Sequence, residues 1–413
     1  MLAAAELQPQ RKTQRRCGHE ALPALRQTRK KFNRTTVLLK TTVMFLINIP
    51  WLPYICWLAN ISCSTLFMDY SNIIRKAWEE YDATKIIHKI EDISPMVSTN
   101  YVYRVTFEDE DIIIAKLSYF GKYEYFKEDH RIIHTLSNNL LYPYENFLAK
   151  SLLRNNRVYM YRYKHGKTDV WVVFYNPVRV LQRMPRRLDD NHIRKFGQQT
   201  GKFHKACSRL RNVLPKSIKT LRTDIKALLE MLEKDKKKFT PEQADYLRHH
   251  CDLFIRNRLK CNVSSFEIIP VFIDWNIGNF SVTNKLELYS RWDYDWFRMS
   301  YRTLDFYFFS RVVSDAGDKT VFSYLINTMM EDRFIMFLQE YHKVNPLTAN
   351  EIRFLKEAYR FFILNYVVKN GSYFFSGLYA EKMQAEAFDI YLPSVDRDFD
   401  AEKLIQALKI KEL

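Results

Sequence analysis

Hydrophobic and polar positions over the first part of the chain predict a small β-sheet. Four runs rich in β-branched and aromatic residues have the length and pattern of strands: 101–107, 112–116, 157–163 and 170–175. The first two flank an acidic turn at 108–111, and Asn176-Pro177 ends the last. Between the two pairs, apolar residues at helical spacing predict a helix over 124–136.

The later part of the chain predicts mainly helix, over 193–204, 215–262 and 314–413. Two helix starts are marked by capping patterns. Thr240-Pro241-Glu242-Gln243 offers an N-cap residue, a proline at the first helical position and a glutamine at the third. Thr348 and Glu351 form a second capping box ahead of an apolar run.

One stretch inside the helical part returns to a strand pattern and predicts a β-hairpin. An apolar entry at 268–273 leads to Asp274 and Asn279, two short strands follow within 280–289, and Asp293 comes next. Because a hairpin doubles the chain back, Asn279 and Asp293 are expected near the same end of it.

The residues around this hairpin suit phosphoryl transfer. A carboxylate at 274 can accept a proton from an attacking hydroxyl, and the oxygens of Asn279 and Asp293 suit the hard cation Mg²⁺. Taken singly, each residue also fits an ordinary turn or a solvated loop acid. Their combination between a β-type entry and a hairpin is the context that such a site requires.

Lys116 and Glu128 add a second element to this pattern. A lysine at a strand end, paired with a glutamate on the next helix, holds the phosphates of ATP in kinases. On their own the two residues also fit surface charges. The presence of Asp274 downstream favours the phosphate-binding interpretation.

Composition narrows the possible functions. The 413 residues are enough for two domains or one large bilobal one. Only 9 are glycine, where average usage would give about three times as many, so a glycine-rich phosphate loop is not expected. The six cysteines lack CxxC pairs and zinc-ligand spacing, which argues for a reducing, cytoplasmic compartment without disulfides.

Much of the formal charge of +17 lies in an N-terminal extension, 1–67. Residues 1–40 carry ten Lys or Arg against two Glu, and 41–67 carry no charge. The uncharged stretch is long enough for a membrane anchor, which takes about 20 apolar residues. It equally fits a packed hydrophobic arm, or sequence upstream of a true start at Met68. The remaining positive excess fits an anionic ligand, and no aromatic-interleaved basic stripe indicates nucleic acid.

From residue 95 to about 310, these features resemble the aminoglycoside phosphotransferase and choline kinase superfamily of small-molecule kinases. Segment 98–105, with Asn100, resembles the phosphate-facing first hairpin of that family. Helix 193–204 resembles its helix ending in Leu-His or Phe-His, although His204 itself is expected to pack between helices.

The later motifs complete the resemblance. Asp274 and Asn279 fall on the Asp and Asn of the H-G-D-x-x-x-x-N loop, Asp293 falls on the metal-binding Asp, and Asp305 falls on a later structural Asp. Asp295 is left open, as a second metal ligand or a substrate-side acid.

The resemblance implies an α+β, bilobal, protein-kinase-like fold. A small β-rich N-lobe is expected at 68–176 and a larger helical C-lobe at 177–413, with the catalytic and metal loops at 270–296. The implied function is transfer of the γ-phosphate of ATP to a hydroxyl of a sugar, amino alcohol or aminoglycoside-like molecule.

The implied roles follow the family motifs. Lys116, Glu128 and Asn100 would bind the nucleotide, Asn279 and Asp293 would hold Mg²⁺, and Asp274 would accept the proton of the substrate hydroxyl. No nucleic-acid partner is expected.

The chain departs from the family at Phe272-Ile273, where His-Gly is usual, so the histidine that normally braces the metal-binding Asp is absent. This keeps open a pseudokinase or nucleotide-binding scaffold. The segment 41–67 keeps open a membrane-associated kinase of a lipid or glycan hydroxyl. A protein kinase is disfavoured, because neither a glycine loop nor an Ala-Pro-Glu motif is present.

Overall fold

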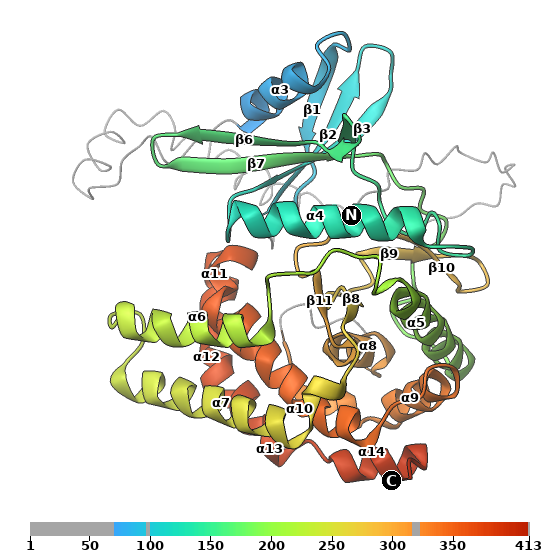
Figure 1. Cartoon of the computed structure of the whole chain (residues 1–413), viewed down its shortest axis with the longest axis vertical. Coiled ribbons are helices and arrows are strands. Elements are labelled where there is room, and N and C mark those ends of the chain that lie inside the picture. The colour runs from blue at the N-terminus through green and yellow to red at the C-terminus, as the bar shows by residue number, and fades with distance from the viewer. Residues whose placement is uncertain (1–69, 96–99, 316–322, 412–413) are drawn as a thin grey trace, which may run out of the picture. The chain divides into compact units, whose positions relative to one another are not determined.

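The computed structural model describes residues 70–95, 100–315 and 323–411 (Figure 1). The extension 1–67, including the uncharged segment 41–67, lies outside these residues. The described residues from Ile74 onward belong to one compact unit. No helix within the described ranges combines the length and apolar character needed to cross a membrane.

A five-stranded antiparallel sheet forms the first part of this unit, in the order β1-β2-β3-β7-β6. Its strands are β1 Ile87–Asp92, β2 Tyr101–Phe107, β3 Ile112–Ser118, β6 Met160–His165 and β7 Thr168–Tyr175. All four strands expected from the sequence are present. Lys116 on β3 pairs in register with Val102 on β2 and Val173 on β7, which places it in the middle of the sheet.

Two helices flank the sheet. The Trp78 ring of α3 (Tyr70–Tyr81) packs on Phe107 and Phe174, with ring centroids 4.6 and 5.4 Å apart. Helix α4 (Tyr123–Asn139) lies between the sheet and the helical part (Figure 1) and buries Ile132, Ile133 and Leu136.

Two small antiparallel ladders form the frame of the predicted catalytic region. Strand β8 (Ile269–Val271) pairs with β11 (Arg298–Ser300), and β9 (Phe280–Val282) pairs with β10 (Leu288–Arg291). The second ladder is the hairpin predicted from the sequence. Together they fix both ends of the loops 272–279 and 292–297.

Helices make up most of the remaining chain: α5 Asp190–Leu210, α6 Leu221–Lys234, α7 Pro241–Lys260, α8 Phe306–Val313, α9 Asp332–Val344, α10 Ala349–Phe362, α11 Gly371–Phe374, α12 Gly377–Glu386, α13 Leu392–Arg397 and α14 Ala401–Leu408. Between them run two π-helical segments, η6 Ile363–Lys369 and η7 Ala387–Tyr391. The capping boxes expected at Thr240 and Thr348 are both formed.

Helices α5 and α9 approach each other closely because α5 has glycines at the contact. A Cβ atom at Gly197 would lie 2.5 Å from the Phe337 carbonyl oxygen of α9, and one at Gly201 would lie 3.2 Å from Val344 Cβ. This close packing brings His204, near the end of α5, against Tyr341 of α9 and toward the catalytic region.

Candidate active site

The loop that follows β8 is held in an unusual backbone conformation by one buried carboxylate. Ile273 has a φ of +59°, a left-handed conformation that β-branched residues rarely adopt. Asp305 Oδ1 accepts hydrogen bonds from the main-chain N–H groups of Phe272 (3.0 Å) and Ile273 (2.6 Å). His204 Nε2 lies 3.0 Å from Asp305 Oδ2, which orients that carboxylate. Asp305 thus shapes the turn that presents Asp274.

Asp274 is half-buried at the head of this loop. Its Oδ1 accepts from the main-chain N–H of Asn276 at 3.2 Å. Its main-chain oxygen accepts from Asn279 Nδ2 at 3.4 Å and from Arg291 Nη2 at 2.8 Å. The backbone of Asp274 is therefore tied both to its own loop and to strand β10.

Asn279 and Asp293 lie at the same end of the β9–β10 hairpin. The main-chain N–H of Trp292, next to Asp293, donates to the Asn279 carbonyl oxygen at 3.0 Å. Asp293 has a φ of +66°, and 38% of its side chain is exposed. The hairpin thus brings together the two residues that the spacing in the sequence singled out, and the Asn279 side chain contacts the main chain of Asp274.

Lys116 reaches this acidic group from the sheet. Its ammonium lies 2.9 Å from Asp293 Oδ1 and also pairs with Asp295, and Asn100 Nδ2 donates to Asp295. Burial alone would lower the pKa of Lys116, but the two carboxylates raise it above its usual range. Lys116 therefore stays charged although only 6% of it is exposed.

The two carboxylates respond in opposite directions. Burial and the neighbouring charge of Asp293 raise the pKa of Asp295. Burial also opposes ionisation of Asp293, but the charge and hydrogen bond of Lys116 outweigh it and lower the pKa of that group. Lys116 thus favours the charged form of Asp293 more than that of Asp295.

The predicted ion pair between Lys116 and Glu128 is wrong. The Glu128 carboxylate accepts from Ser217 Oγ at 2.6 Å and from the main-chain N–H of Ile218 at 3.0 Å. On α4, the ring of His130 contacts the Tyr175 hydroxyl on β7, the strand that pairs with β3. Glu128 and His130 are two positions apart on α4, which corresponds to a rotation of about 200° around the helix axis, so Glu128 projects away from the side of α4 that carries His130.

Arg291 is the residue that the sequence reasoning missed. Its fully buried guanidinium lies over the rings of Phe272 and Trp275, 4.6 and 4.5 Å from their centroids. The only sequence signal is an arginine at the end of the short strand that precedes Asp293. Phe272, which stands where a histidine was expected, therefore contacts the guanidinium of Arg291 and supplies no polar group of its own.

The donors of this site fit a hard divalent cation that also binds phosphate oxygens. Asn279 uses its Nδ2 to bond Asp274, so its Oδ1 is the amide atom suited to a cation, together with the carboxylates of Asp293 and Asp295. The described residues contain no cluster of three or more His, Cys, Asp or Glu that could hold a metal ion. An amide and phosphate oxygens would complete the coordination.

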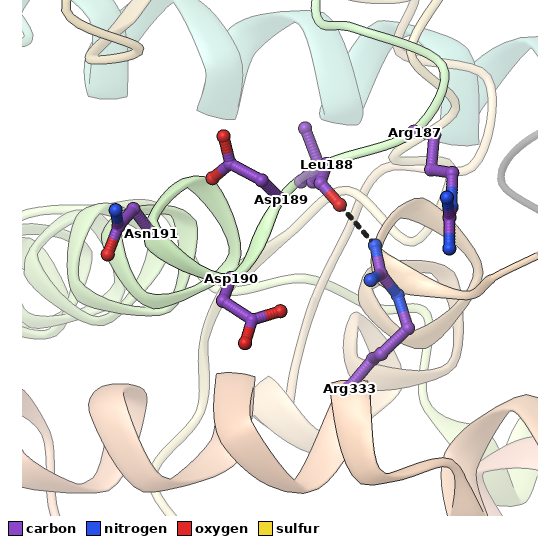
Figure 2. A pocket seen from close by; sticks show the side chains of 6 residues that line it. All are labelled: Arg187, Leu188, Asp189, Asp190, Asn191 and Arg333. Atoms are coloured by element: carbon purple, nitrogen blue, oxygen red, sulfur yellow. Dashed lines mark hydrogen bonds between the residues drawn. The ribbon is translucent and has the colours of Figure 1, made fainter.

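A surface pocket lies away from these residues, at the start of α5. Figure 2 shows its lining, which includes Asp189, Asp190 and Arg333, with Arg333 donating to the Leu188 carbonyl oxygen. Arg187, also in the lining, pairs with Asp315 at 2.9 Å. None of the predicted site residues lines this pocket.

The fold is that of the protein-kinase-like small-molecule kinases. No family model and no curated protein matches the chain. Among solved structures, an amicoumacin kinase, hAmiN, in complex with AMP-PNP, Ca²⁺ and Ami superimposes with a TM-score of 0.54 at 16% identity. It aligns over 82% of this chain and 97% of its own.

A microcompartment-associated aminopropanol kinase gives a TM-score of 0.52 at 14% identity, over 83% of this chain and 99% of its own. Both similarities extend over nearly the whole of the compared proteins. The expected α+β, bilobal, protein-kinase-like fold is therefore confirmed, as is the resemblance to this group of kinases at the level of fold.

Proposed function

We propose that this chain is a phosphotransferase that moves the γ-phosphate of ATP to a hydroxyl group of a small molecule. The observation that carries the proposal is a chain of contacts: Lys116 pairs with Asp293, the residue before Asp293 bonds Asn279, and Asn279 bonds the main chain of Asp274. The two compared structures support it, because they are an amicoumacin kinase and an aminopropanol kinase, and the first contains AMP-PNP and Ca²⁺.

Asp274 takes the role of proton acceptor. Its half-buried carboxylate heads a loop whose backbone is fixed from both sides, so it can orient and deprotonate an acceptor hydroxyl. General-base help of this kind is typically worth about 10²–10⁴-fold. Mg²⁺, when bound, would supply charge neutralisation at the phosphates, with Asn279 and Asp293 as its ligands and Asp295 beside them.

Lys116 is the residue that binds phosphate oxygens. We assign to Asp295 the orienting role first expected of Glu128, because Asp295 contacts the Lys116 ammonium and is itself held by Asn100. Asn100 thus acts on the nucleotide site through Asp295. The division into lobes at 176/177, with a catalytic body starting at Met68, is part of the same proposal.

The experiment compares wild type with Asp274→Asn. Transfer of radiolabelled γ-phosphate is measured across a panel of amino alcohols, sugars and aminoglycosides, and binding of an ATP analogue is measured by calorimetry. We expect turnover to fall by about 10²–10⁴-fold with nucleotide binding retained, since only the proton acceptor is lost.

Asp252→Asn, at an exposed position on α7, is the matched control and keeps wild-type turnover. Equal turnover in wild type and Asp274→Asn would refute the assignment of Asp274.

A nucleotide-binding scaffold without transfer is the second candidate. Two observations favour it: the ammonium of Lys116 pairs with both loop carboxylates, and Phe272 replaces the expected histidine. Nucleotide binding by wild type without transfer to any acceptor or to water would select this alternative. No described residue adds support for the membrane-associated form.

A further inference from the structure

Arg291 is a fully buried cation at the centre of the catalytic region. Resting on the proposed function, we propose that Arg291 is the positioning residue that locks the backbone of Asp274 to the strand leading to Asp293. A histidine at position 272 was expected to brace this region, but Phe272 stands there, and the bracing contact would come from Arg291 on β10 instead.

The main chain of Arg291 is anchored independently of its side chain. Its N–H donates to the Phe147 carbonyl oxygen at 2.5 Å, and its own carbonyl oxygen accepts from the Ala149 N–H at 2.9 Å. It also pairs with Phe280 across the β9–β10 ladder. The side chain therefore projects from a fixed point, and its bond to the Asp274 carbonyl oxygen transmits that position to the loop.

The guanidinium has fewer partners than a structural arginine of similar burial. Arg291 Nε and Nη1 are buried without a hydrogen-bond partner among the described residues. Arg360 is equally buried, but its guanidinium bonds Glu357, Asp396 and His250. Unpaired buried donors are unfavourable, and such features concentrate at functional sites.

What the side chain does contact points to the loop. It donates to the main chain of Asp274 and lies against Phe272 and Trp275, the residues two positions before and one after that aspartate. Burial tends to lower the pKa of Arg291, while the charges of Asp274 and Asp305 oppose that effect. The guanidinium is thus a fixed positive charge among the carboxylates that build the site.

The test uses Arg291→Met, which keeps the apolar stem but removes the guanidinium, and Arg291→Lys, which keeps the charge and a donor. Arg360→Met is the control, since its partners lie on α7, α10 and α13. Three experiments are carried out on the full chain: steady-state kinetics, which give kcat per folded molecule and KM for ATP, thermal unfolding, and hydrogen exchange of peptides that cover 272–279.

We expect Arg291→Met to lower kcat by on the order of 10²-fold with little change in KM for ATP, as loss of alignment does. Exchange across 272–279 should become faster, and Arg291→Lys should recover part of both effects. Arg360→Met should lower thermal stability without altering kcat or exchange in this loop. Those contrasts separate positioning from a general loss of packing.

Unchanged kcat and unchanged loop exchange in Arg291→Met would overturn the inference. If wild type transfers phosphate to no acceptor, the proposed function fails, and the exchange measurement alone then decides whether Arg291 positions the loop. Faster exchange confined to 272–279 would support the positioning role in that case, and its absence would refute it.

Discussion

Replacing Ile273 with alanine and with glycine tests whether the loop before Asp274 is truly held in a left-handed conformation. Ile273 is 1% exposed and has a φ of +59°. A residue with a Cβ atom in this conformation is less favourable than glycine by about 1–2 kcal/mol. The two hydrogen bonds that the main-chain N–H groups of Phe272 and Ile273 donate to Asp305 Oδ1 offset that strain.

Two effects oppose each other at this position. Removal of the buried Ile273 side chain should destabilise the protein by about 2–5 kcal/mol in Ile273→Ala. Ile273→Gly removes the same side chain but also relieves the strain. We therefore expect the glycine variant to be more stable than the alanine variant by about 1 kcal/mol.

Val271, two residues earlier in β8, provides the matched control. It is fully buried, and it is not among the residues with positive φ. At such a position glycine is less stable than alanine by about 0.5–1 kcal/mol. The order of the two variants should thus reverse between the two sites.

Urea unfolding of the four variants, followed by tryptophan fluorescence, measures this order directly. If Ile273→Gly is less stable than Ile273→Ala by the same amount as at Val271, the backbone conformation assigned to this loop is wrong. The role assigned to Asp305 would fall with it.

Three further predictions concern single side chains. Glu128→Gln should leave the affinity for an ATP analogue unchanged in calorimetry, whereas Asp295→Asn should weaken it, because Asp295 contacts Lys116 and Glu128 bonds Ser217 instead. The opposite ranking would restore the Glu128 assignment. Burial lowers the pKa of His130 to about 3 in the folded protein, whereas a histidine of the unfolded chain has a pKa of about 6.5. Between these two values only the unfolded chain binds the proton, so the folding constant should fall by up to about tenfold for each unit by which the pH is lowered. His130→Gln should flatten that dependence in unfolding measured from pH 7 to 4, and an unaltered slope would count against it. Thr240→Ala removes the N-cap of α7 and should cost about 1 kcal/mol in urea unfolding, with no effect expected from substitution of an exposed mid-helix residue.

The parts of this structure that depend on local sequence could be predicted. The β9–β10 hairpin follows from two short apolar runs around a polar turn, and the starts of α7 and α10 follow from side chains that bond their own backbone. Strand β1 was not predicted, because it is an edge strand of mostly polar residues whose burial does not alternate cleanly.

The errors at the site involve contacts between distant segments. Helix α4 buries Ile132, Ile133 and Leu136, and its rotation about its own axis decides whether Glu128 or His130 faces the sheet. The spacing of apolar residues in one sequence does not give the angle at which a helix is rotated against a sheet. The contact of Arg291 with Phe272 likewise joins the end of β10 to the residue after β8. The sequence shows only an arginine at the end of a short strand and does not indicate which distant residue it contacts.

The left-handed conformation of Ile273 also bears on how backbone turns are recognised from sequence. Eight non-glycine residues of the described chain have positive φ, against two glycines. In this protein a buried carboxylate enforces a turn that a glycine would adopt freely. A glycine in a sequence pattern is therefore one means of building such a turn and not a requirement for it, so a search for the glycine alone would overlook this turn.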